Sequence, residues 1–169
     1  MSDAPTVHIP TVYIIAGETS GDYLGAELLK ALQSDHPDIQ IFGIGGEEMM
    51  NAGLNQPLFP MSDLSLMGLI EIVPQIPKML RRINQTVADI QRVDPDILIT
   101  IDAPDFVFRV AKKVKKAMPE RPIVHYVAPT VWAWREGRAA KIARFLDHIL
   151  CLFPFEPPYF ERVGLRADF

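Results

Sequence analysis

The sequence lacks the features that mark several large classes of protein. Its one cysteine, Cys151, cannot form an internal disulfide, which is typical of proteins that work in a reducing cytosol. No apolar run approaches the roughly 20 residues that span a bilayer, and the first residues show no basic stretch followed by an apolar one, as a signal peptide would. Positive charge is not in excess, because 17 Lys and Arg face 21 Asp and Glu, giving a net charge of −4. We therefore expect no nucleic-acid partner.

Several common site motifs are also missing. No cluster of Cys and His has the spacing of a zinc site. The first glycine-rich loop is not followed by Gly-Lys-Ser/Thr, so there is no P-loop, and no Gly-x-Ser-x-Gly nucleophile elbow occurs. We therefore expect neither a metal ion nor a cofactor.

What the 169 residues do contain is a regular alternation of short apolar runs and amphipathic helical patterns. With 49% apolar and 22% charged residues, the chain has the composition of one globular domain. Strands are expected over residues 12–16, 39–44, 97–101, 122–127 and 148–153, with a further strand starting near 166. Helices are expected over residues 24–32, 47–52, 106–118 and 137–145, with short ones starting at 62 and 157 and a longer one ending near 92. This alternation predicts an α/β fold, a doubly wound, mostly parallel Rossmann-like sheet with helices on both faces.

In such a sheet, ligands bind outside the carboxyl ends of the strands. Asp102 follows a wholly apolar strand and therefore lies at the rim of this edge. A carboxylate there can act as a general base, or it can be a buried group that accepts backbone N–H groups of its own loop. Position alone leaves both interpretations open. Asp105 is better placed to cap the helix over 106–118.

The loop after the first strand carries glycines at every fourth position from Gly17 to Gly25. It also carries Glu18 and Asp22, and carboxylates compete with a phosphate for a helix N-terminus, which argues against a dinucleotide site. Two interpretations remain. In one, Thr19 or Ser20 caps the helix and Asp22 favours its first turn; in the other, the loop binds a sugar or another hydroxyl-bearing ligand.

Aromatic residues gather after the strand over 122–127, where Trp132 and Trp134 are the two tryptophans of the chain. Indole rings stack on the apolar faces of sugars, but they also serve to cover the end of a sheet. His125, inside the same strand, is interpreted as a core histidine rather than a catalytic one.

The segment over 69–83 interleaves many apolar residues with Lys78, Arg81 and Arg82. Pro74 and Pro77 are expected to mark the first turn of the helix that ends near Arg92. Such a helix packs on the sheet, or lies on a membrane with its basic residues at anionic head groups. The apolar surface of the segment is wide enough for one part to pack on the sheet while another meets a membrane.

Five motifs occur in a distinctive order: Ala16–Asp22, Met67–Glu71, Ile101–Phe106, His125–Arg135 and Leu152–Glu156. Together they resemble lipid-A-disaccharide synthase, a family of inverting glycosyltransferases, over about residues 12–168. The resemblance implies that residues 1–169 form the N-terminal, acceptor-side lobe of a glycosyltransferase-B fold. The C-terminal lobe, which binds the UDP-sugar in this family, would then be absent from the chain.

The resemblance also implies a reaction. The family transfers 2,3-diacylglucosamine from UDP to 2,3-diacylglucosamine 1-phosphate, forming a β-1,6-linked disaccharide phosphate and UDP, as a peripheral protein on the cytoplasmic face of the inner membrane. Asp102 matches the proposed general base, and Glu18 is a second catalytic candidate. The candidate substrate-binding residues are Gly17, Thr19, Ser20, Asp22, Trp132, Trp134 and Arg135. The candidate membrane- or acyl-facing residues are Ile70, Ile72, Val73, Ile76, Met79 and Leu80. A homodimer is left open, as is the alternative of a non-catalytic α/β module that binds a nucleotide or lipid.

Overall fold

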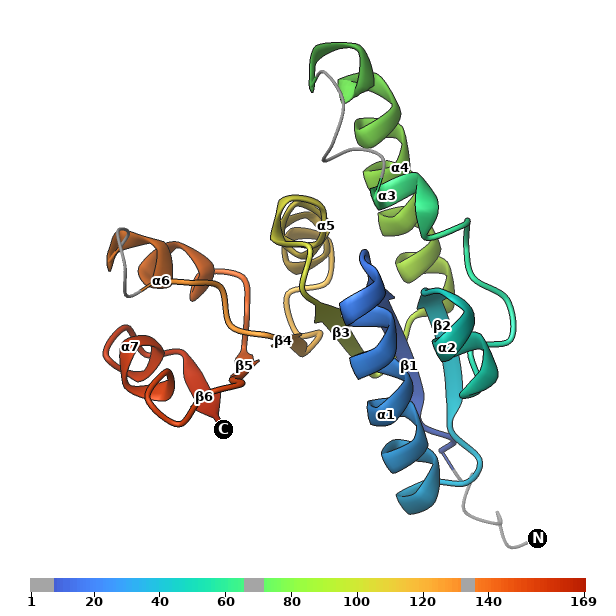
Figure 1. Ribbon diagram of the computed structural model, residues 1–169, viewed down its shortest axis with the longest axis horizontal. Coiled ribbons are helices and arrows are strands. Elements are labelled where there is room, and N and C mark those ends of the chain that lie inside the picture. Colours follow the sequence, from blue (N-terminus) through green and yellow to red (C-terminus); the bar gives the residue numbers. More distant parts are fainter. Residues whose placement is uncertain (1–7, 66–71, 132–135) are drawn as a thin grey trace, which may run out of the picture.

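The computed structural model describes residues 8–65, 72–131 and 136–169, and these build one parallel sheet flanked by helices. The strand order is β2-β1-β3-β4-β5-β6 and every neighbouring pair is parallel, with β2 and β6 at the two edges (Figure 1). The strands are β1 (Thr11–Ala16), β2 (Gln40–Ile44), β3 (Ile97–Ile101), β4 (Ile123–Tyr126), β5 (His148–Leu150) and β6 (Arg166–Asp168). The predicted sheet is confirmed, including the strand that starts at Arg166, although β5 ends three residues before the predicted Phe153.

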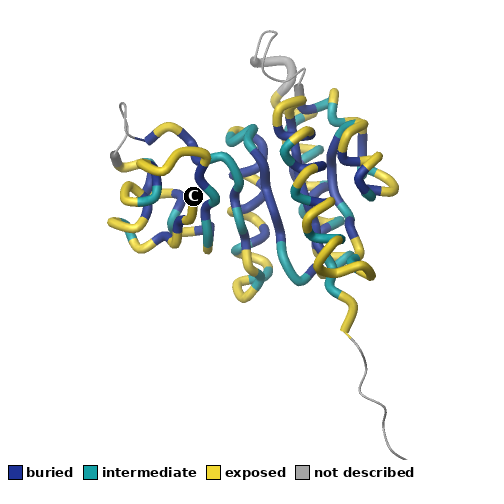
Figure 2. Tube along the Cα trace, turned by 60° about the horizontal axis from the view of Figure 1, so that its bottom comes forward, coloured by how far each residue is buried: buried dark blue, intermediate teal, exposed yellow. Residues whose placement is uncertain are grey.

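Helices cover the sheet on both faces. They are α1 (Thr19–Asp35), α2 (Glu47–Asn51), α3 (Ser62–Ser65), α4 (Ile72–Val93), α5 (Pro104–Ala117), α6 (Glu136–Ile142) and α7 (Pro157–Glu161). One buried cluster joins a face of the central strands to α1 and α2 through Ile14, Ile99, Ala26, Leu29 and Met49. A second cluster joins the opposite face to α4, α5, α6 and α7 through Tyr13, Ile83, Phe106, Ile142 and Phe160. The central strands β1 and β3 are thus buried between helices whose outer sides are exposed (Figure 2).

Three local predictions about helix starts are wrong. α1 begins after Glu18, with no side-chain cap, so neither Thr19 nor Ser20 caps it. The residue before α5 is Ala103 rather than Asp105, because Pro104, whose missing N–H suits the first helical position, starts that helix two residues early. α4 begins at Ile72, so Pro77 lies inside the helix and not in its first turn.

A pair of basic residues ties α3 to α4. Asp63 accepts hydrogen bonds from Lys78, at 3.1 Å, and from Arg82. The bond from Lys78, followed by that from Arg82, holds the pKa of Asp63 below its usual value. These contacts fix the short segment whose next residue, Leu64, packs beside Gly17 of the loop after β1.

His125 belongs to the core, as expected. Its side chain is 1% exposed, its Nδ1 lies 2.9 Å from Thr100 Oγ1, and its ring meets that of Phe108 edge-to-face at 4.7 Å. Burial removes the stabilisation that water gives the imidazolium ion, and it lowers the pKa of His125 to about 3. The residue is therefore neutral in the folded chain above about pH 3.

We expect the substitution His125→Gln to remove part of the pH dependence of stability. Below the ordinary histidine pKa of about 6.5 the unfolded chain binds a proton that the folded chain refuses down to about pH 3. Within this window the free energy of unfolding falls by about 1.4 kcal/mol for each pH unit of acidification because of this residue. Urea titrations between about pH 7 and pH 4 measure the slope, and equal slopes for the two proteins would contradict the assignment.

Candidate active site

The loops after β1 and β3 are pressed together at the carboxyl edge of the sheet. A Cβ atom placed on Gly17 would lie 2.6 Å from the Cβ of Ala103, so this approach requires glycine. One turn further on, the hydroxyl of Ser20 donates a hydrogen bond to Asp102 Oδ2 at 3.3 Å. The two segments that the sequence singled out separately therefore form one site.

Backbone strain concentrates at the same edge. Asp102 (φ 49°) and Ala103 (φ 43°) follow β3 in the left-handed region, and Val127 (φ 76°) follows β4. This region is costly for residues with a side chain, most of all for a β-branched one. Backbone hydrogen bonds hold the turns, from Asp102 N–H to Tyr126 O and from Val127 N–H to Leu150 O, both at 3.1 Å. Strained residues of this kind cluster at functional sites.

The carboxylate of Asp102 keeps access to solvent. The residue is half-buried, its Oδ2 accepts from Ser20, and its Oδ1 has no hydrogen-bond partner among the described residues. Within that part of the chain, no backbone N–H of the loop donates to it, which disfavours the interpretation as a purely structural carboxylate. An accessible carboxylate oxygen at the rim of the site is what proton abstraction requires.

Asp22 has a different role from its neighbours in the loop. It is 3% exposed, and its carboxylate accepts three backbone N–H groups at the start of α2: Gly46 at 2.7 Å, Glu48 at 3.1 Å and Met49 at 3.2 Å. The acid in the first turn of α1 therefore caps α2 from outside. This geometry favours a structural role for Asp22, whereas Glu18 and Thr19 are exposed beside the site.

The 69–83 segment divides between core and surface. Ile83 is buried, and Met79, which is half-buried, packs against the same core. Ile76 and Leu80, one turn apart on another side of α4, are 41% and 44% exposed. Ile72 and Val73 lie in the first turn of α4, and Ile70 lies outside the described residues. Trp132, Trp134 and Arg135 also lie outside them.

A family model for lipid-A-disaccharide synthetase matches residues 12–169. The chain belongs to this family. It is 52% identical over 159 residues to the lipid-A-disaccharide synthase of Rhodospirillum centenum, and 50% identical over 158 residues to that of Rickettsia bellii. Each match covers 94% of this chain but 39% and 41% of the relatives, so the chain spans about two fifths of their length.

The fold also has a counterpart among solved structures. The crystal structure of Acinetobacter baumannii MurG superposes with a TM-score of 0.53 at 14% identity, over 86% of this chain and 41% of that one. This likeness concerns architecture alone. It confirms the expected Rossmann-like α/β fold for this member of the lipid-A-disaccharide synthetase family.

The structure shows an aromatic pair within the motif Leu152–Glu156. The sequence alone assigns these two residues no role. Phe153 and Phe155, both exposed, stack at 5.5 Å in the turn after β5. The turn is held by Glu156, a 1% exposed carboxylate that accepts the N–H groups of Leu152 and Phe153 at 2.9 and 3.0 Å. The sequence feature that could have indicated this turn is an acid, Glu156, three residues after an aromatic residue, Phe153. The pair adds exposed aromatic surface to the carboxyl edge of the sheet.

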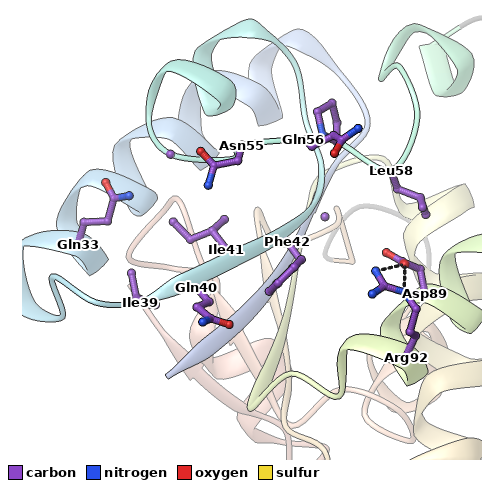
Figure 3. A pocket seen from close by; sticks show the side chains of 13 residues that line it. Gln33, Ile39, Gln40, Ile41, Phe42, Asn55, Gln56, Leu58, Asp89 and Arg92 are labelled. Carbon is purple, nitrogen blue, oxygen red and sulfur yellow. Dashed lines mark hydrogen bonds and ion pairs between the residues drawn. The ribbon is translucent and has the colours of Figure 1, made fainter. Parts of the chain in front are cut away.

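A cavity of about 740 Å³ lies away from this edge, along the free side of β2 (Figure 3). Its lining is rich in side-chain amides and includes the ion pair of Asp89 with Arg92. None of the residues that we singled out for chemistry lines it. Across the described ranges, no three metal-ligating side chains gather to hold an ion, and no helix is long and apolar enough to cross a membrane.

We expect Asp22→Ala to destabilise the fold without touching the exposed loop residues. The change leaves three N–H groups at the start of α2 without their charged acceptor, which costs about 1.5–3 kcal/mol of unfolding free energy. Asp105→Ala is the matched control, because Asp105 is exposed in the first turn of α5 and its loss should cost less than about 0.5 kcal/mol. Urea unfolding of both variants tests this. Equal stabilities would show that Asp22 is not a cap.

Proposed function

We propose that this chain is the acceptor-side lobe of a lipid-A-disaccharide synthase. The observation that carries the proposal is Asp102, an accessible carboxylate on a strained turn after the central strand β3, hydrogen-bonded to Ser20 of the neighbouring loop. In this proposal the acceptor is 2,3-diacylglucosamine 1-phosphate and the donor is its UDP-activated counterpart. Membership of the family supports the choice of substrates.

Asp102 acts as the general base. One carboxylate oxygen takes the proton of the acceptor 6-hydroxyl while that oxygen attacks the anomeric carbon of the donor sugar. The new C–O bond forms on the face opposite to UDP, the bond to the UDP phosphate breaks, and its electron pair leaves with UDP, so the configuration inverts. The hydroxyl of Ser20, donating to Oδ2, orients the carboxylate, and the exposed Glu18 and Thr19 line the acceptor side of the site.

The remaining three fifths of the relatives' length is proposed to hold the UDP-sugar. Without groups that bind and polarise the leaving UDP, the transition state gains little stabilisation. The chain of 169 residues alone should therefore release no UDP from the sugar nucleotide. UDP release by this chain alone would contradict the division into an acceptor and a donor lobe.

We expect Asp102→Ala to lower the transferase rate about 10²–10⁴-fold, the usual effect of removing a general base. The assay follows UDP release from UDP-2,3-diacylglucosamine in the presence of the acceptor, with the chain extended to the length of its relatives. Asp105→Ala, three residues away and exposed in α5, is the control and should retain its rate. A rate for Asp102→Ala within tenfold of the unsubstituted enzyme would sink the general-base assignment.

We further propose that the protein lies on the inner face of the inner membrane through the exposed end of α4. The double substitution Ile76→Ser/Leu80→Ser should weaken co-sedimentation with phosphatidylcholine vesicles more than tenfold, because burying each such side chain contributes about 1.5–3 kcal/mol. Ile9→Ser/Met50→Ser is the control, since these residues are similarly exposed, 44% and 42%, but lie on other elements. Unchanged binding of the α4 variant would remove α4 from the membrane contact.

A further inference from the structure

Positive charge is concentrated in one groove although the chain is acidic overall. A cavity of about 500 Å³ between α5 and α6 is lined by five cationic residues and Phe145. The cations are Lys112, Lys115, Lys116, Lys141 and Arg144. Such a set has no role in the chemistry proposed at Asp102.

A second cavity of about 500 Å³ continues the groove toward α4. Its cations are Arg109, Lys112, Lys113 and Arg138, and Leu80, Ile83 and Asp105 also line it. Because Lys112 lines both cavities, we treat the two as one basic groove over α4, α5 and α6. Eight of the 17 basic residues of the chain line this groove, against one carboxylate.

Most of this charge is not neutralised within the protein. Lys115 pairs with Asp147 at 2.9 Å, whereas Lys113 donates to the neutral amide of Asn84 and Lys112 lies 5.1 Å from the centre of the Phe145 ring. Among the described residues, no carboxylate forms an ion pair with Lys116, Lys141 or Arg144. The groove therefore attracts anions from solution.

The basic groove is continuous with the apolar side of α4. Ile76, Leu80 and Asn84 recur at every fourth residue, so they share one side of the helix. Leu80 lines the groove, and Asn84 is bound at 2.7 Å by Lys113 of α5. The first turns of α4 project beyond the other elements (Figure 1). Exposed aliphatic residues flanked by cations are typical of surfaces that lie in the interface of a bilayer.

We propose that the basic groove docks on anionic lipid: its cations engage the phosphates of the head groups while Ile76 and Leu80 enter the acyl region. This inference rests on the membrane contact proposed above and names the lipid chemistry that it recognises. A nucleic acid fits less well. Base stacking needs exposed aromatic rings, and the aromatic residues that line the groove, Phe108 and Phe145, are buried.

The test compares vesicles of phosphatidylcholine with and without phosphatidylglycerol, using Lys116→Gln/Lys141→Gln. Each basic residue near an anionic surface contributes about fivefold to binding, so the double variant should bind the phosphatidylglycerol vesicles about 25-fold more weakly and the neutral vesicles equally well. Lys30→Gln/Arg166→Gln removes the same charge from α1 and β6 and should change neither. High salt should abolish the preference for phosphatidylglycerol in the unsubstituted chain.

Four results would overturn the proposal. Equal binding to both vesicle types by the unsubstituted chain would mean that lipid charge is not recognised. Equal losses in the groove and control variants would mean that only net charge matters. Tighter binding of a DNA oligonucleotide than of the anionic vesicles, lost in Lys116→Gln/Lys141→Gln, would assign the groove to nucleic acid. If Ile76→Ser/Leu80→Ser fails to bind while the groove variant binds normally, the membrane contact stands and the groove is not part of it.

Discussion

The whole arrangement depends on burying a parallel sheet on both faces. β1 and β3 lie between α1 and α2 on one side and α4 and α5 on the other, so their side chains are almost all apolar and without access to water. The polar exceptions within these strands are Thr11, at the partly exposed start of β1, and Thr100, which is hydrogen-bonded to His125. Polar chemistry is therefore excluded from the strands and appears where they end. Because all six strands are parallel, those ends lie on one edge, and loops distant in sequence are brought together there without any dedicated binding element.

That edge combines strain with rigid support. The turns at Asp102, Ala103 and Val127 use backbone conformations that cost free energy, and they persist because the neighbouring strands fix both of their ends. The close contact of Gly17 with Ala103 and the capping of α2 by Asp22 hold the loop after β1 in the same manner. The result is a carboxylate and a hydroxyl that are held within hydrogen-bonding distance of each other. Preorganisation of this kind is what a general base needs, since little energy remains to be spent on arranging it during the reaction.

Sequence reasoning succeeded where a local pattern determines the structure. Residues 97–101 are a short run of apolar and β-branched residues, a pattern typical of a buried strand. Asp102 follows this strand directly, so the candidate base could be placed on the correct edge of the sheet. It failed where the partner lies far along the chain. The sequence places Asp22 in the first turn of its own helix, but nothing local shows that the donors to its carboxylate are N–H groups 24 to 27 residues away. The division of α4 between Met79 and Ile76 likewise depends on which side of the helix the sheet occupies, and periodicity alone does not give that side.

The candidate base and the basic groove are linked by a single rigid element. α5 begins two residues after Asp102 and carries Arg109 and Lys112 into the groove along its outer side. Its buried side, from Phe106 to Val114, is packed on the sheet, so the helix cannot turn independently of the strands. A charged surface that engages lipid through this helix would therefore also fix the orientation of the carboxyl edge of the sheet. In the reaction proposed above, the acceptor carries acyl chains, and this coupling would let its 6-hydroxyl approach Asp102 while the chains remain in the bilayer.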